Sequence, residues 1–309
     1  MSKQFVDLSV DPSVKVIEGQ FKTSDGVILY TRTWKAVSDK PIATVVFIHG
    51  FAEYVKRYNH VFDKFARENI EVYAYDQRGC GQTTELNKNM ALGNSGGWIV
   101  TQKDITEALR SQRKEGIPQY LVGHSMGGGL TLRYACEGDE RLNIAGYISA
   151  SPWLRLSPQT LNLIRCLALP IISTASMFLP NLTVDGRVDA NYISRDPDQA
   201  KKYSEDYFIQ EASTHATLLT LGDINTGGEL VLEKEYKNMV SPIYLAHGSA
   251  DPITDPNASK QFIQKIKADN VMFREWEGRY HEMHNDYGNT EVVQSYVKWI
   301  LEHVNSAST

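Results

Sequence analysis

The segment from Gly123 to Gly127 reads Gly-His-Ser-Met-Gly and fits the G-x-S-x-G pattern of a nucleophilic serine. An apolar run precedes it and a helical pattern follows it, so Ser125 is predicted on a sharp turn between a strand and a helix. Such a strained turn needs glycine on both sides, because neighbouring Cβ atoms would not fit. The alternative is a glycine-rich phosphate-binding turn, which the absence of G-K-[S/T] and G-x-G-x-x-G disfavours.

A serine hydroxyl is a weak nucleophile until a base removes its proton, so an acid and then a histidine should follow Ser125 along the chain. His281 and His284 lie in the loop after the last expected strand, and His281, the closer to that strand, is the predicted base. Asp251 comes directly after a buried strand and is the predicted acid, with Asp255 as the alternative. Together these residues predict a Ser-His-Asp triad.

Acyl transfer also needs two N–H donors for the oxyanion of the tetrahedral intermediate. The first is predicted to be the backbone N–H of Met126, the residue after the nucleophile. The second should come from a loop after an earlier strand, and the backbone N–H of Phe51 is in that position.

A mostly parallel sheet has to bring these residues together. A hairpin is expected around Ser24 to Gly26, followed by short apolar runs typical of strands buried on both faces. The expected strands are Val16 to Lys22, Val27 to Trp34, Ala43 to Ile48, Ile70 to Tyr75, Tyr120 to Val122, Ile144 to Ala150, Ile243 to Ala246 and Val271 to Trp276. The expected helices are Tyr58 to Arg67, Lys103 to Lys114, Met126 to Glu137, Ala258 to Lys267 and Glu291 to Asn305. This alternation predicts a doubly wound α/β sheet with an antiparallel edge.

Residues 153–241 interrupt this alternation, because a strand-helix-strand unit needs only about 30 residues. They are predicted to form a mostly helical inserted cap on a core made of residues 1–152 and 242–309. The cap contains an uncharged run from Cys166 to Val184, nearly the length of a membrane span. Prolines within the run favour an apolar helical lid instead.

Composition limits the possible partners and the cellular location. The chain has 309 residues and a net charge of −5, which offers no broad attraction to nucleic acid. Three cysteines without paired spacing are typical of reduced thiols, and no Cys/His cluster has the spacing of a zinc site. The first residues lack the apolar region of a secretory signal, so a cytoplasmic location is expected.

Several segments make the chain resemble the monoacylglycerol lipases of the α/β-hydrolase superfamily, especially the fungal members. These segments are His49 to Glu53, Asp76 to Gly81, Gly123 to Gly129, Gly248 to Asp251, Gly278 to His281 and, in the cap, Leu179 to Leu182 and Ile193 to Pro197. The resemblance implies the α/β-hydrolase fold, with Ser125, Asp251 and His281 as the triad and Phe51 and Met126 as the oxyanion donors. Some family members use cap cysteines as redox groups, but here only Cys166 lies in the cap.

The resemblance also implies the substrate, a long-chain monoacylglycerol that is hydrolysed without metal or cofactor. Glu53 and Arg57 lie within one turn of the oxyanion loop, and His284 lies three residues after His281. All three match polar residues that the family places around glycerol, so they are expected to bind substrate. The alternative is a surface salt bridge with a nearby histidine.

The cap is expected to supply an apolar tunnel for the acyl chain and a peripheral contact with lipid droplets or intracellular membranes. Two other enzymatic functions fit the same triad, those of a general carboxylesterase and of a lysophospholipase. A hydrolase-shaped binding protein is a third possibility, which an intact triad disfavours. A peptidase would need an acidic group in the cap to bind a substrate amine, and the sequence gives no clear sign of one.

Overall fold

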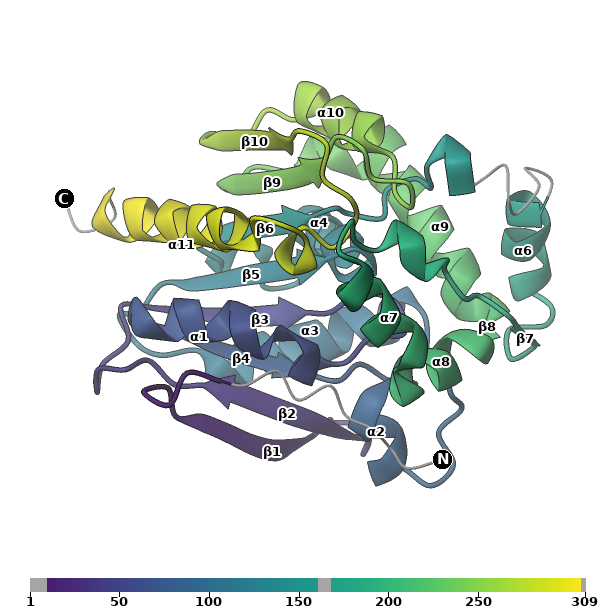
Figure 1. The fold of residues 1–309 in the computed structure, drawn as a ribbon, viewed down its shortest axis with the longest axis horizontal. Coiled ribbons are helices and arrows are strands. Elements are labelled where there is room, and N and C mark those ends of the chain that lie inside the picture. The colour runs from purple at the N-terminus through teal and green to yellow at the C-terminus, as the bar shows by residue number, and fades with distance from the viewer. Residues whose placement is uncertain (1–9, 161–167, 307–309) are drawn as a thin grey trace.

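An eight-stranded sheet forms the centre of the computed structural model, which describes residues 10–160 and 168–306 (Figure 1). The strand order is β1-β2-β4-β3-β5-β6-β9-β10, and β2 runs antiparallel to both of its neighbours while the other pairs are parallel. The strands are β1 (Val16–Lys22), β2 (Ile28–Trp34), β3 (Ala43–Ile48), β4 (Ile70–Tyr75), β5 (Gln119–His124), β6 (Gly146–Ala150), β9 (Ile243–Gly248) and β10 (Val271–Trp276). The expected parallel sheet with an antiparallel edge is confirmed.

Helices cover both faces of this sheet. In Figure 1, α1 and α11 lie on the face toward the viewer, and α3 and α4 lie behind it. The helices around the sheet are α1 (Asn59–Arg67), α2 (Gly81–Leu86), α3 (Trp98–Gln112), α4 (Met126–Glu137), α10 (Pro256–Lys265) and α11 (Asn289–Ser306). Short 3-10 turns add η1 (Val55–Tyr58), η2 (Arg141–Asn143), η3 (Ala190–Tyr192), η4 (Glu235–Asn238) and η5 (Met283–Asn285).

The alternation of side chains along β3 explains why the central strands read as unbroken apolar runs. Val45 and Phe47 pack into the core under α1 and α11, whereas Val46 and Ile48 pack into the core under α3 and α4. Successive side chains of a strand point to opposite faces, so a strand covered on both faces is apolar at every position.

Helix ends differ most from the sequence expectations. The third helix begins at Trp98, five residues before the expected Lys103, because Gly97 adopts φ 80° and forms its N-cap. Pro256 opens α10, and the side chain of Asp255 accepts a hydrogen bond from the backbone N–H of Asn257 at 2.9 Å. Proline is favoured in the first turn of a helix and aspartate at its N-cap. The short helix α2 carried no periodic signal and was not predicted.

Between β6 and β9 the chain forms a group of helices at the carboxyl ends of the parallel strands, on the right in Figure 1. Its elements are α6 (Ala168–Ser176), β7 (Thr183–Val184), α7 (Pro197–Glu205), α8 (Tyr207–Thr214), β8 (Ala216–Thr217) and α9 (Leu218–Glu233). We propose that these elements are the cap, with the boundaries 153–241 predicted above. Among the described residues, no helix combines the length and the apolarity needed to cross a membrane. Cys166 lies outside the described residues.

Candidate active site

The turn between β5 and α4 holds Ser125 in a strained conformation. Ser125 has φ 55° and ψ −119°, which places its backbone in a region that side-chain-bearing residues rarely adopt. A Cβ atom on Gly123 would lie 2.2 Å from the carbonyl oxygen of Gly127, and one on Gly127 would lie 2.1 Å from that of Ile48. Both glycines are therefore required for the close approach of α4 to β5 and β3.

The loop after β10 brings His281 to this serine. His281 Nε2 lies 2.8 Å from Ser125 Oγ, and its Nδ1 lies 2.8 Å from Asp251 Oδ2. All three side chains are buried. The structure thus brings together the serine, histidine and aspartate that the sequence singled out, in the geometry of a proton relay.

Asp251 is held by several donors in the loop after β9. Its Oδ1 accepts the backbone N–H groups of Ile253 and Thr254 at 2.8 and 3.1 Å, and its Oδ2 accepts the Thr254 hydroxyl at 2.8 Å. His247 Nε2 lies 3.2 Å from the same Oδ2, a contact that the sequence analysis missed although His247 stands four residues earlier, in β9. Asp255, the alternative acid, caps α10 instead.

Charge coupling within the relay moves both pKa values. Burial raises the pKa of the Asp251 carboxyl, but the His281 charge and the surrounding donors outweigh burial and bring it well below its usual range. Burial lowers the pKa of His281, but the Asp251 carboxylate outweighs burial and raises it above its usual value. Asp251 therefore stays ionised and favours the imidazolium that forms when His281 takes a proton.

The backbone amides of Phe51 and Met126 are the predicted oxyanion donors. Phe51 lies in the turn after β3, and Met126 is the first residue of α4, where the helix dipole favours negative charge. Within residues 10–160 and 168–306, neither amide donates to a backbone or side-chain acceptor. The turn after β3 is held in shape by the side chain of Glu53, whose Oε2 accepts the Gly50 N–H at 3.0 Å.

The predicted glycerol-binding residues Glu53 and Arg57 are buried and contact each other. Arg57 Nη1 donates to Glu53 Oε1 at 2.8 Å, and the guanidinium also donates to both carboxylate oxygens of Glu282 at 2.9 and 3.0 Å. We call Glu53, Arg57 and Glu282 the buried ion cluster. Its ion pairs lie inside the protein and not at the surface, where the alternative interpretation placed a salt bridge. Glu282 was not predicted, because nothing in its local sequence shows that it meets Arg57.

The two carboxyl groups of the buried ion cluster have pKa values shifted in opposite directions. Burial raises the pKa of Glu53 to about 7. Burial also acts to raise the pKa of Glu282, but the bidentate Arg57 overrides it and holds that pKa well below its usual range. The geometry agrees with this direction, because Arg57 makes one hydrogen bond to Glu53 and two to Glu282.

His284 completes this buried region. Its ring stacks on Tyr58 with centroids 4.9 Å apart, and it meets the His124 ring edge-on at 4.7 Å. Burial lowers the pKa of His284 to about 3, so its ring is neutral near pH 7. Its Nε2 is buried and has no hydrogen-bond partner among the described residues.

Glu53, His124 and Glu282 also bring possible metal-ligand atoms within 4.8 Å of one another. The Arg57 guanidinium already donates to both of these carboxylates. A second positive charge there would meet direct repulsion from Arg57, so the arrangement does not suit a metal ion.

A cavity of about 270 Å³ lies next to the oxyanion turn, between the cap and the core. Its walls are mainly apolar, with Phe51 from the core and Trp153, Leu156 and Ile172 of α6 from within the proposed cap boundaries. Phe51 belongs to both features, because its backbone amide is a predicted oxyanion donor and the residue also lines the cavity. Phe51 is thus the residue that the cavity shares with the predicted oxyanion turn, whereas Ser125, Met126 and His281 are not among the residues that line it.

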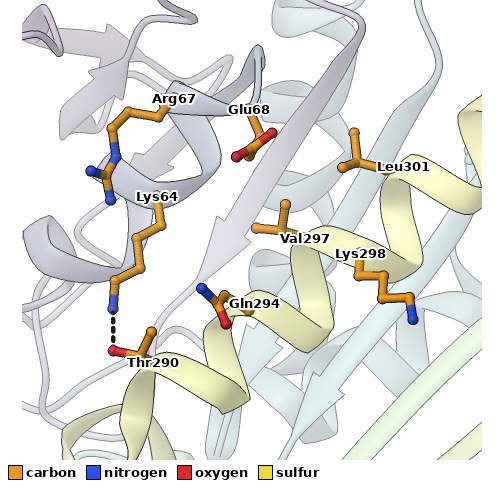
Figure 2. A pocket seen from close by; sticks show the side chains of 8 residues that line it. All are labelled: Lys64, Arg67, Glu68, Thr290, Gln294, Val297, Lys298 and Leu301. Carbon is orange, nitrogen blue, oxygen red and sulfur yellow. Dashed lines mark hydrogen bonds between the residues drawn. The ribbon is translucent and has the colours of Figure 1, made fainter.

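Two aspartates line this cavity, but each already has a partner. Asp185 pairs with Arg187, and Asp189 accepts the backbone N–H of Asn191 at 2.9 Å as the N-cap of η3. A larger hollow of about 510 Å³ lies elsewhere, between α1 and α11, and Figure 2 shows its polar rim with Lys64 directed at Thr290. None of the predicted site residues lines that hollow.

Comparisons with known proteins agree on the fold and on a hydrolase. Residues 39–288 match the protein family described as serine aminopeptidase, S33. The chain is 33% identical to a putative monoglyceride lipase of Schizosaccharomyces pombe, over 91% of this chain and 73% of that protein. It is 26% identical to the monoglyceride lipase of Saccharomyces cerevisiae, over 94% and 95% of the two chains.

Solved structures show the same architecture. A soluble variant of the S. cerevisiae monoglyceride lipase, in complex with a substrate analogue, superimposes with a TM-score of 0.81 at 24% identity, covering 97% of this chain and 98% of that one. The monoacylglycerol lipase of Paleococcus ferrophilus superimposes with a TM-score of 0.78 at 26% identity, covering 89% and 99%.

Proposed function

The chain belongs to the S33 serine aminopeptidase family of α/β-hydrolases, and from this premise we propose that it hydrolyses monoacylglycerols to a fatty acid and glycerol. The observation that carries the proposal is the position of Phe51, which connects an apolar cavity to the turn beside Ser125. An apolar cavity suits an acyl chain, whose burial contributes about 0.8 kcal/mol per CH₂. The similarity to monoglyceride lipases supports the same substrate class.

The proposed mechanism follows from the geometry. His281 Nε2 removes the proton of Ser125 Oγ as that oxygen attacks the ester carbonyl, and the Phe51 and Met126 amides bind the resulting oxyanion. When the tetrahedral intermediate collapses, His281 gives the proton to the departing glycerol oxygen. Water, activated by His281, then attacks the acyl-serine and releases the fatty acid. Asp251 orients the imidazole and stabilises its charged form.

Cleavage of an amide at a free amino terminus is less well supported by the site. A substrate amine needs a carboxylate that is free to bind it; of the two aspartates that line the cavity, Asp185 is ion-paired with Arg187, and Asp189 is held as the N-cap of η3 by two hydrogen bonds from Asn191 to its Oδ1. An uncharged glycerol ester needs no such partner.

A hydrolysis panel tests the proposed substrate. We expect kcat/KM for a long-chain monoacylglycerol to exceed that for the diacylglycerol, the triacylglycerol and the lysophospholipid with the same acyl chain. A higher value for the lysophospholipid, or for short water-soluble esters, would favour the lysophospholipase or carboxylesterase alternative. Failure of a fluorophosphonate to label Ser125 would favour a binding protein, because only an activated serine reacts.

We further propose that the cap contacts a lipid surface through an apolar edge, defined as Met177, Phe178, Leu179 and Leu182. Met177 and Phe178 are each 76% exposed, and Leu179 and Leu182 are more than half exposed. Neighbouring exposed apolar side chains are typical of surfaces that bind proteins or membranes. A monoacylglycerol is itself held in such lipid surfaces, so this contact would bring the cavity near its substrate.

The double variant Phe178→Asp/Leu179→Asp is expected to partition onto liposomes at least about tenfold more weakly, since losing the burial of even one such side chain costs ~1.5 kcal/mol or more. Sedimentation with vesicles measures the effect, and wild-type binding should depend only weakly on salt. Leu142→Asp is a matched control, because Leu142 is 68% exposed in η2, near the amino ends of the parallel strands and away from the cap. Equal binding of the double variant and the control would contradict the proposed contact.

A further inference from the structure

The oxyanion turn and the catalytic-histidine loop come from distant parts of the chain, and one arginine connects them. Arg57 follows the oxyanion turn in η1, whereas Glu282 lies directly after His281. Arg57 Nη1 donates to Glu53 Oε1 at 2.8 Å and to Glu282 Oε1 at 2.9 Å, and its Nη2 donates to Glu282 Oε2 at 3.0 Å. The planar guanidinium thus contacts a carboxylate from each loop.

Each of these carboxylates also holds part of its own loop. Glu53 Oε2 accepts the Gly50 N–H at 3.0 Å and the Tyr58 hydroxyl, which fixes the turn that presents the Phe51 amide. Glu282 Oε2 accepts the Asn285 side-chain amide at 2.7 Å. A shift of either carboxylate would therefore move the backbone next to Phe51 or next to His281.

Burial makes these contacts strong and specific. Glu53, Arg57 and Glu282 are only 4%, 7% and 0% exposed. The ring of Tyr203, from cap helix α7, lies 5.3 Å from the guanidinium carbon. Charge-assisted hydrogen bonds strengthen when water is excluded, and a bidentate arginine also fixes the relative orientation of its partners.

We propose that Arg57 is a positioning residue, which clamps the oxyanion turn to the catalytic-histidine loop through the buried ion cluster. This inference rests on the proposed acyl-transfer function, and it changes the role expected for Arg57 and Glu53. Their charged atoms align the Phe51 amide with His281 and Ser125. This role requires no contact with glycerol. His284, with its free Nε2, remains the candidate for glycerol contact.

A variant of Arg57 can distinguish a clamp from a glycerol contact, because only a glycerol contact would lower activity on the glycerol ester alone. Arg57→Lys keeps the buried positive charge but cannot form the two-pronged contact with Glu282 while also reaching Glu53. We expect kcat to fall by about 10- to 100-fold, the range associated with small misplacements of catalytic groups. The fall should be equal for a monoacylglycerol and for the p-nitrophenyl ester of the same acid, with KM unchanged. The rate of fluorophosphonate labelling should fall in parallel, because that reaction needs the same alignment.

Arg78→Lys is the matched control. Arg78 is also a largely buried arginine, and it bridges Asp25 and Asp104 from different segments, but neither partner belongs to the candidate site. This variant should keep kcat on both esters. It shows whether replacing any buried bidentate arginine lowers kcat, apart from an effect on the candidate site. Thermal unfolding of every variant shows whether it is folded at the assay temperature. If Arg57→Lys does not fold, Glu282→Gln takes its place, because it removes the charge of one partner while keeping its shape.

Two results would overturn the clamp. A loss confined to the monoacylglycerol, with the p-nitrophenyl ester hydrolysed normally, would assign Arg57 to glycerol recognition. An unchanged kcat and labelling rate in a folded variant would show that the alignment does not depend on the cluster. The proposed function fails in a different way, through poor hydrolysis of monoacylglycerol by the wild-type protein, and the clamp can still be tested on the p-nitrophenyl ester.

Discussion

Replacing Ser125 with alanine is expected to lower kcat by about 10⁶-fold, and His281→Ala should cost about as much, because the two groups act as one unit in the proton relay. The distance of 2.8 Å between Ser125 Oγ and His281 Nε2 is the basis for this expectation. Hydrolysis of a p-nitrophenyl ester measures the loss, and circular dichroism should show an intact fold. Residual activity should come from the oxyanion donors and substrate binding alone.

Two control variants make the comparison specific. Ser204→Ala changes an exposed serine of α7, and His215→Ala changes an exposed histidine at the end of α8, so both should keep full activity. His284→Ala should reduce turnover of monoacylglycerol only through weaker binding. Abolished turnover in His284→Ala, with activity retained in His281→Ala, would show that the wrong histidine has been assigned.

Asp251→Asn is expected to lower kcat by about 10⁴-fold, because an amide at this position favours the wrong tautomer of the histidine and cannot stabilise its charged form. His281 Nδ1 lies 2.8 Å from Asp251 Oδ2, so the substitution acts directly on the base. Asp255→Asn is the matched control four residues later, since asparagine also serves well as the N-cap of α10. A comparable loss in Asp255→Asn would identify it as the acid.

The pH dependence of kcat/KM gives a second readout of the same pair. His281 must be neutral to accept the Ser125 proton, so kcat/KM falls as the pH drops through the pKa of His281. The Asp251 charge outweighs burial and raises that pKa above its usual value, so the acid limb of wild type lies above the pH typical of a free histidine. Asp251→Asn removes this charge and leaves burial in effect, which should move the acid limb to lower pH. A limb that stays in place would contradict the assignment of Asp251.

The expected elements lie where the local pattern is strong. The β10 strand (Val271–Trp276) and the α4 helix (Met126–Glu137) have the predicted bounds, because the alternation of strand and helix signals is clear around both. The expected hairpin became β1 and β2, paired antiparallel from Val16 opposite Trp34 to Lys22 opposite Ile28. The short helix α2 has only six residues, too few to show a helical period, so the sequence offered no signal for it.

For the site, the candidate catalytic residues were predictable from the sequence, whereas the pairing of the charged residues was not. Local glycine requirements of a strained strand-to-helix turn identified Ser125, and chain order together with closeness to the preceding strands selected Asp251 over Asp255 and His281 over His284. Glu53 and Arg57 were selected by their closeness to the oxyanion turn. Nothing local showed that their charged atoms would be paired inside the protein.

Local sequence is sufficient to predict the turn at Ser125 and the strands that end beside it, because backbone sterics and apolar periodicity act over a few residues. The partners of the charged side chains, in contrast, depend on the folded arrangement. Arg57 and Glu282 are 225 positions apart, and so their contact depends on how the folded sheet brings the segments after β3 and β10 together. Such long-range pairing leaves no local pattern, because burial and the exclusion of water, which make the pairing strong, exist only in the folded chain.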